Sequence, residues 1–137
     1  MSRVRSIIAT SRIRMAEAGY RQRGYQQHRL WAVLAVLAAV TIAVGSLLPG
    51  SEMPSTLPWD KFNHFVGYAG LAGLIGLSGL LLWRTFIVVV LYGIGIEYLQ
   101  LLVPGRTGGD GMDIFANTLG ALAAVLLLAA LRRYRLR

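Results

Sequence analysis

The amino-acid sequence predicts an all-α integral membrane protein, a bundle of four transmembrane helices with both termini in the cytoplasm. Of its 137 residues, 55% are hydrophobic, and the mean hydropathy is +0.57. A chain this apolar is poorly suited to a soluble domain, whose surface has to face water. The apolar residues form four runs, each close to the roughly 20 residues that cross a hydrocarbon core of about 30 Å. The length allows one domain.

The four runs define the predicted membrane spans, which are Leu30–Leu48, Phe65–Trp83, Thr85–Val103 and Ile114–Leu131. The first contains neither a charged residue nor a proline, and too many residues precede it for a cleaved signal peptide. The third contains one charged residue, Glu97, and the fourth contains none.

Basic residues distinguish the two sides of the membrane. Twelve lie in the N-terminal tail, in the connection between the second and third spans and in the C-terminal tail, whereas Lys61 and Arg106 lie on the opposite side. The positive-inside rule places the more basic side in the cytoplasm. We therefore expect residues 1–29 to form a basic cytoplasmic tail, and residues 30–137 to form one transmembrane domain with a short basic C-terminal tail.

The basic tail has two interpretations. It lacks a folded motif that reads bases, so we expect no nucleic-acid partner. It serves instead as a topology determinant that also contacts anionic membrane lipids, at about 1 kcal/mol for each basic residue near the surface. Met15 is an alternative start site, and the sequence leaves the oligomeric state open.

Glycines recur every three residues through the second span, at positions 67, 70, 73, 76 and 79. Small residues let helix backbones approach closely in lipid, so we expect these glycines to form a groove buried against another helix. Gly93, Gly95 and Gly120 are candidates to face it. A flexible hinge is the alternative.

The other polar residues gather on the side opposite the termini. The candidates are Asp60, Lys61, His64, Glu97, Gln100, Arg106, Asp113 and Asn117. Asp60 and His64 are four residues apart, as are Asp113 and Asn117, so each pair shares one helix face. Glu97 lies about 9 Å along the helix from the end of its span, at 1.5 Å per residue. An ionisable group at this depth costs a few kcal/mol unless it is paired or hydrated, which makes it a functional candidate.

The residue types suggest roles for this cluster. As catalytic groups we predict Asp60 orienting His64 for acid–base chemistry, together with Glu97 and Asp113. As substrate-binding groups we predict Lys61, Gln100, Arg106 and Asn117. A divalent metal on His64, Glu97 and Asp113 is chemically compatible, but no spacing demands one. The sequence therefore predicts no metal and no cofactor.

Each candidate also has a structural interpretation. Asp60 and Asp113 precede apolar runs, as helix N-caps do. Glu97 and Gln100 have the alternative of bonding across helices or to Arg106. His64 alone is typical of a helix at the membrane interface, and Arg106 of an anchor to phosphate head groups.

The ordered set of motifs resembles the VanZ-like family of bacterial membrane proteins. The matching blocks are Asp60-Lys61-Phe62-Asn63-His64-Phe65 with Tyr68, then Glu97-Tyr98-Leu99-Gln100, then Pro104-Gly105-Arg106, and finally residues 113–120, which read Asp-Ile-Phe-Ala-Asn-Thr-Leu-Gly. The resemblance covers about residues 30–131, and Asp110 has no assigned counterpart. It implies a cell-envelope protein of the bacterial inner membrane. The family is named after a protein associated with resistance to the antibiotic teicoplanin, and it implies no settled reaction.

These observations lead to a functional hypothesis with alternatives. The first is a polar extracytoplasmic site that handles a lipid-linked or phosphorylated envelope compound. The second is a non-catalytic binding protein for a lipid head group or wall fragment. Ion or proton transport with Glu97 as carrier is disfavoured, because the cytoplasmic half of the bundle contains few polar residues. The sequence leaves enzyme and binding protein undecided.

The topology can be tested with reporter fusions. A reporter enzyme that is active only in the periplasm should be active when fused near Ser55 or Gly109 and inactive when fused after Arg137, because twelve of the fourteen basic residues lie on the side of the termini. Reporter activity in intact cells measures this. The reversed pattern would contradict the predicted orientation.

Overall fold

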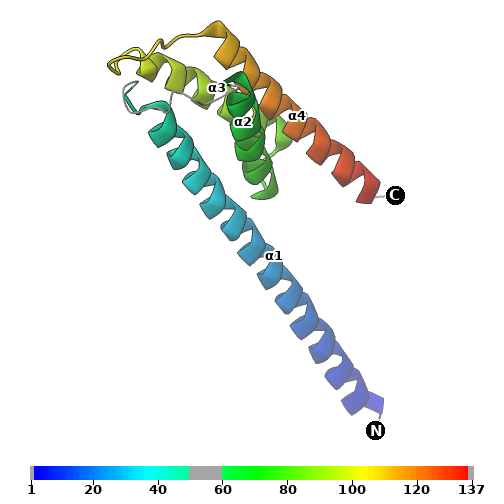
Figure 1. Ribbon diagram of the computed structural model, residues 1–137. Coiled ribbons are helices and arrows are strands. Elements are labelled where there is room, and N and C mark those ends of the chain that lie inside the picture. Colours follow the sequence, from blue (N-terminus) through cyan, green and yellow to red (C-terminus); the bar gives the residue numbers. More distant parts are fainter. Residues whose placement is uncertain (1, 50–59, 136–137) are drawn as a thin grey trace.

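The protein is all-α over the part of the chain that the structure describes, which confirms the all-α part of the predicted fold class. The computed structural model describes residues 2–49 and 60–135, with side chains at residues 22, 24–49 and 61–135. Its helices are α1 (Ser2–Ser46), α2 (Asp60–Leu77), α3 (Leu82–Gln100) and α4 (Gly111–Arg135) (Figure 1). Helix α1 runs through residue 30 without a break, so the predicted boundary between tail and membrane domain is not the end of an element.

The four helices alternate in direction. At one end of the bundle, which we call the polar end, the last turns of α1 and α3 meet the first turns of α2 and α4; contacts of Ser46 with Gln100 and of His64 with Asp113 define it. At the opposite end, Arg132 of α4 donates to the Gly76 carbonyl of α2 at 2.7 Å. Arg29, Arg84 and Arg132 belong to this second, basic end.

Three of the helices are long and apolar enough to cross a membrane: residues 24–46 of α1, all of α3 and all of α4. The protein is therefore a multi-pass membrane protein. The second predicted span, Phe65–Trp83, is not confirmed. Helix α2 begins at Asp60 with a polar first turn and ends at Leu77. Gly79 follows with φ of +102°, a left-handed conformation that glycine adopts readily, and the chain turns there instead of continuing to Trp83.

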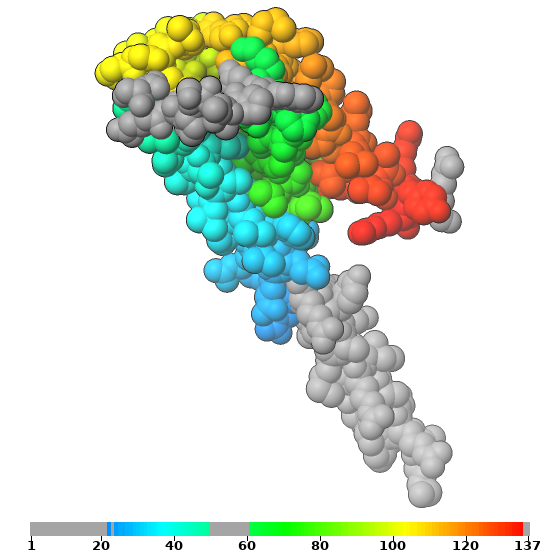
Figure 2. Space-filling view, viewed as in Figure 1, coloured from blue at the N-terminus to red at the C-terminus, as the bar shows by residue number. Residues whose placement is uncertain are grey.

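The apolar core lies between the polar and basic ends. Its buried residues are Tyr68, Leu71, Ala72, Val89 and Ala121, from α2, α3 and α4. Helix α1 lies beside α2 (Figure 2) and is tied to α3 by the Tyr92 hydroxyl, which donates to the Ala39 carbonyl at 2.5 Å. The other faces of α1 and α4 carry large exposed apolar side chains, which is the pattern of helices that face lipid.

The glycine pattern of α2 predicted the contact residues only in part: a Cβ at Gly76 would lie 2.5 Å from the Leu128 side chain of α4, as a buried groove requires. A Cβ at Gly73 would meet no atom within 4 Å, and the same is true of Gly70 and Gly95. The closest helix approach is made from the other side, by Gly120 of α4. A Cβ at Gly120 would overlap the Phe65 carbonyl oxygen and lie 3.0 Å from the Ala69 nitrogen. Small residues do bring α2 and α4 together, but the essential glycine is on α4.

Gly120→Ala should lower the thermal stability of the purified protein in detergent. The added methyl meets α2 backbone, which cannot rotate away as a side chain would, so we expect a loss of about 1–3 kcal/mol in unfolding free energy. Gly73→Ala is the matched control, since it adds the same methyl to open space and should be neutral or slightly stabilising. Equal melting temperatures for the two variants would contradict the close approach.

Candidate functional site

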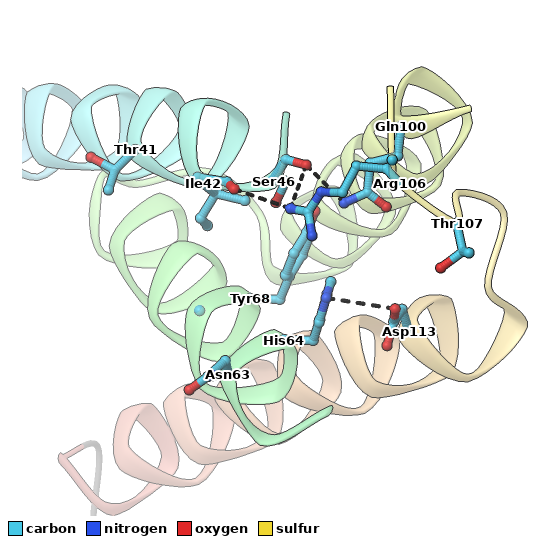
Figure 3. Close-up of a pocket in the computed structure, with 13 residues that line it drawn as sticks. Thr41, Ile42, Ser46, Asn63, His64, Tyr68, Gln100, Arg106, Thr107 and Asp113 are labelled. Carbon is cyan, nitrogen blue, oxygen red and sulfur yellow. Dashed lines mark hydrogen bonds and ion pairs between the residues drawn. The ribbon is translucent and has the colours of Figure 1, made fainter. Parts of the chain in front are cut away.

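A cavity of about 410 Å³ lies at the polar end of the bundle, where α1, α2, α3 and α4 converge with the loop between α3 and α4 (Figure 3). The polar side chains that line it come from every one of these elements: Thr41, Ser46, Asn63, His64, Tyr68, Gln100, Arg106, Thr107 and Asp113. Helices that are far apart in sequence therefore supply one site, as alternating helix directions require.

Arg106 and Gln100 hold the end of α1 against the end of α3. One Nη of Arg106 donates to the carbonyls of Ser46 at 2.8 Å and Gly45 at 3.2 Å, and the Gln100 amide donates to Ser46 at 3.0 Å. The last carbonyls of a helix have no partner within the helix, so these bonds cap α1. The two residues line the cavity as well, and Nε of Arg106 is buried with no hydrogen-bond partner among the described residues.

His64 joins α2 to α4. Its Nδ1 lies 3.0 Å from Oδ1 of Asn117, and its Nε2 lies 3.7 Å from Oδ2 of Asp113. An amide oxygen only accepts hydrogen bonds, so Nδ1 is the nitrogen that carries the proton toward Asn117. In the neutral ring the lone pair is then on Nε2, which faces the Asp113 carboxylate. The side chains of His64 and Asp113 are only 13% and 10% exposed.

Lys61 links two carboxylates at the mouth of the site. Its ammonium donates to Oδ1 of Asp113 and, at 2.7 Å, to Oδ2 of Asp110. The Lys61 ammonium and the Met112 N–H together hold the pKa of Asp110 below its usual range. Burial lowers the pKa of Lys61, but its bonds to the two carboxylates outweigh this effect and raise the pKa above its usual range.

Glu97 is the most deeply buried ionisable residue of the site. None of its surface is exposed, and neither carboxylate oxygen accepts a hydrogen bond from the described residues. One ligand atom of Glu97, one of His64 and one of Asp113 lie within 4.8 Å of one another. The Tyr68 hydroxyl and the Asn117 amide nitrogen are also buried without partners among the described residues. Buried polar groups normally find partners, but this cluster has polar atoms whose hydrogen-bonding capacity the described residues do not fill.

The structure revises several structural interpretations of single residues. Asp110, and not Asp113, is the N-cap of α4, because its carboxylate accepts the Met112 N–H at 2.7 Å. Asp113 lies within the first turn and faces His64. Gln100 bonds across helices to α1, which confirms one of its structural interpretations, and Arg106 bonds to α1 and not to Glu97. Asp60 begins α2, but its side chain, and so its predicted pairing with His64, lies outside the described residues. The catalytic and substrate-binding roles remain predictions.

Sequence reasoning overlooked Tyr68 as a lining residue of the cavity, and Asp110 as the helix cap that bonds to Lys61 outside the lining. Tyr68 is four residues after His64, so helix periodicity alone places the two on one face, and both line the cavity. Asp110 is three residues before Asp113, the position from which a short side chain caps a helix. Both signals were present in the sequence. However, Tyr68 is equally compatible with an ordinary core aromatic, and Asp110 with an ordinary loop residue.

The sequence of this chain matches one known protein family. A family model described as VanZ/LLP1 matches residues 12–132, which includes every residue of the site. No curated protein and no solved structure matches the chain.

Acid should weaken the polar end through Asp110. Its pKa is lowered by folding, so its stabilising contribution is present above the unfolded value of about 3.9 and is lost as the pH falls through the lower folded value. Melting temperatures of the wild type should therefore fall more steeply below about pH 4 than those of Asp110→Asn. Lys61→Gln should flatten the profile in the same way, because Lys61 is the main cause of the shift. Parallel profiles would refute this coupling.

Proposed function

This chain belongs to the VanZ/LLP1 family, and we propose that its cavity binds the polar head of a lipid-linked or phosphorylated cell-envelope compound at the outer face of the bacterial inner membrane. The observation that carries the proposal is the cavity itself, which all four helices build at the polar end around Arg106, His64 and Asp113. Its volume of about 410 Å³ is in the range of small-molecule sites, roughly 300–1,000 Å³.

The donors of the cavity favour an anionic oxygen ligand. Arg106 contributes a guanidinium whose Nε has no partner among the described residues. Asn63 and Thr107 line the same cavity and are exposed, so their amide and hydroxyl are accessible to a ligand. Guanidinium groups bind phosphate and carboxylate through paired hydrogen bonds. A phosphate or a sugar carboxylate fits this donor set.

One wall of the cavity favours a ligand with a lipid tail. Thr41, Ile42 and Gly45 of α1, with Gly67 of α2, form this nearly apolar wall. Thr41 is five residues before Ser46, so the wall reaches about 7.5 Å deeper along α1 at 1.5 Å per residue. A ligand with its head at Arg106 and its chain along α1 would satisfy both walls. The outward orientation follows from the basic residues at the opposite end.

The same site supports acid–base chemistry on the bound head group. Nε2 of His64, adjacent to Asp113, is placed to exchange a proton with a ligand, and the buried Glu97 is a second such group. A non-catalytic binding protein is the second candidate. It is favoured by the hydrogen bonds of Gln100 and Arg106 to α1, because side chains fixed in this way form a rigid binding site. Ion transport has less support, because the apolar core from Leu71 to Ala121 separates Glu97 from the basic end.

Native mass spectrometry of the protein in lipid tests the binding proposal. With an undecaprenyl phosphate added to neutral lipid, we expect one bound molecule per chain. Arg106→Ala should weaken this binding by about tenfold or more, because a hydrogen bond to a charged group is worth about 1.5–3 kcal/mol. Arg84→Ala is the matched control, since it removes a guanidinium from the basic end and should leave binding unchanged.

Two further variants separate binding from folding and from catalysis. Arg106→Lys keeps the charge without the planar fork and should fall between the wild type and Arg106→Ala. Glu97→Gln should keep the bound lipid but lose any turnover of it. Equal binding by Arg84→Ala and Arg106→Ala would reject an Arg106-centred head-group site. Full turnover by Glu97→Gln would reject catalysis through Glu97.

A further inference from the structure

We infer that His64, Glu97 and Asp113 form a binding site for one divalent transition-metal ion at the inner wall of the cavity. The sequence predicted no metal, because the three residues are 33 and 16 positions apart and no spacing motif joins them. The fold joins them: one ligand atom from each lies within 4.8 Å of the other two.

The distances suit a metal ion after a small contraction. Oxygen and nitrogen ligands bind Zn²⁺ at about 2.0–2.2 Å, so two ligands in tetrahedral geometry are about 3.4 Å apart. Nε2 of His64 and Oδ2 of Asp113 are already 3.7 Å apart. The widest separation in the triad is within 4.8 Å, so an ion would draw these side chains together by about 1 Å or somewhat more. Rotation of the carboxylates is sufficient for such a movement.

Glu97 supplies a second, independent reason. A fully buried side chain with two oxygens that lack partners among the described residues is expensive to maintain, whether as an ion or as a neutral acid. Those oxygens face a histidine and a second carboxylate. A divalent cation would match the charge of the two carboxylates and provide a bond to Glu97.

The residues behind the triad have the arrangement typical of a metal site. Asn117 accepts from Nδ1 of His64, which directs the lone pair of Nε2 toward Asp113. Lys61 donates to Oδ1 of Asp113 and leaves Oδ2 directed at His64. Partners of this kind fix the orientation of ligands, and their loss typically weakens metal binding by about 10–100-fold.

The ligand set indicates the class of ion. One imidazole and two carboxylates suit Zn²⁺, Mn²⁺ or Fe²⁺ better than Ca²⁺ or Mg²⁺, which prefer oxygen ligands only. Three protein ligands leave at least one coordination position for water or an anion, as in catalytic zinc sites. The triad borders the cavity through His64 and Asp113, so an anionic head group could take that position. The ion site itself does not depend on the head-group proposal.

Titration with Zn²⁺ tests the site directly. The full chain, purified in detergent without a polyhistidine tag and treated with a chelator, should bind one Zn²⁺ per molecule by calorimetry. Glu97→Gln and Asp113→Asn should each weaken this binding by at least about 100-fold, since removing a ligand should cost no less than removing its supporting partner. Asp110→Asn is the matched control: it removes a carboxylate on Lys61 that is outside the triad, and it should change the affinity less than about fivefold, because an exposed ion pair contributes little free energy.

A spectroscopic measurement on the wild type, with two histidine variants as comparison, guards against variants that fail to fold. Pulsed electron paramagnetic resonance of bound Mn²⁺ should show coupling to one imidazole nitrogen, and this coupling should disappear in His64→Gln while His28→Gln retains it. Absence of stoichiometric Zn²⁺ binding, or equal weakening by Asp110→Asn and Glu97→Gln, would overturn the inference. The two proposals fail separately: lipid binding by a protein that takes up no Zn²⁺ would overturn only this one, and Zn²⁺ binding by a protein that takes up no lipid would overturn only the other.

Discussion

A buried carboxylate at the meeting point of the helix ends governs the design of this protein. Glu97 has no exposed surface and lies within an apolar span, where an unmatched polar group costs several kcal/mol. The surrounding residues do not fill its bonding capacity, but they do position polar groups around it. His64 belongs to α2, and Asp113 and Asn117 belong to α4. The parallel course of α2 and α4, which both begin at the polar end and are held close by Gly120, is what makes this convergence possible.

The backbone carbonyls at the ends of the helices also need hydrogen-bond partners at this place. In a membrane the last carbonyls of a helix need partners from within the protein. Arg106 and Gln100 satisfy those of α1, and the Gly109 N–H donates to the Glu97 carbonyl at 3.1 Å, folding the loop back over the end of α3. The loop that closes the helix ends therefore also forms a wall of the cavity. Stability of the polar end and shape of the site depend on the same few side chains.

The sequence predicted those features of the structure that depend on residues close together in the chain. Apolar runs and spacings of four residues are local, and they predicted an all-α membrane protein and placed His64, Glu97 and Asp113 on one side. The glycine pattern failed at Gly73 because repetition along a helix does not say which face has a neighbour. Arg106 was considered as a partner of Glu97 on grounds of charge, but it bonds to the α1 carbonyls, whose need for donors is as strong. Such outcomes depend on the relative depth and rotation of four helices, which are set by packing over the whole core and not by any one motif.

Glu97 also shows that the described side chains leave polar groups of the site without hydrogen-bond partners. As an ion, its carboxylate needs donors or a cation for two oxygens, and as a neutral acid it still has one hydroxyl to donate and one carbonyl oxygen to satisfy. Nearby, the Tyr68 hydroxyl and the Asn117 amide nitrogen lack partners among the described residues too. Donors and acceptors that are buried together and yet not bonded to each other are held apart by the backbone. Such an arrangement is stable when a small polar species lies between them, and water, a metal ion and the oxygen of a head group differ chiefly in how much charge they bring to Glu97.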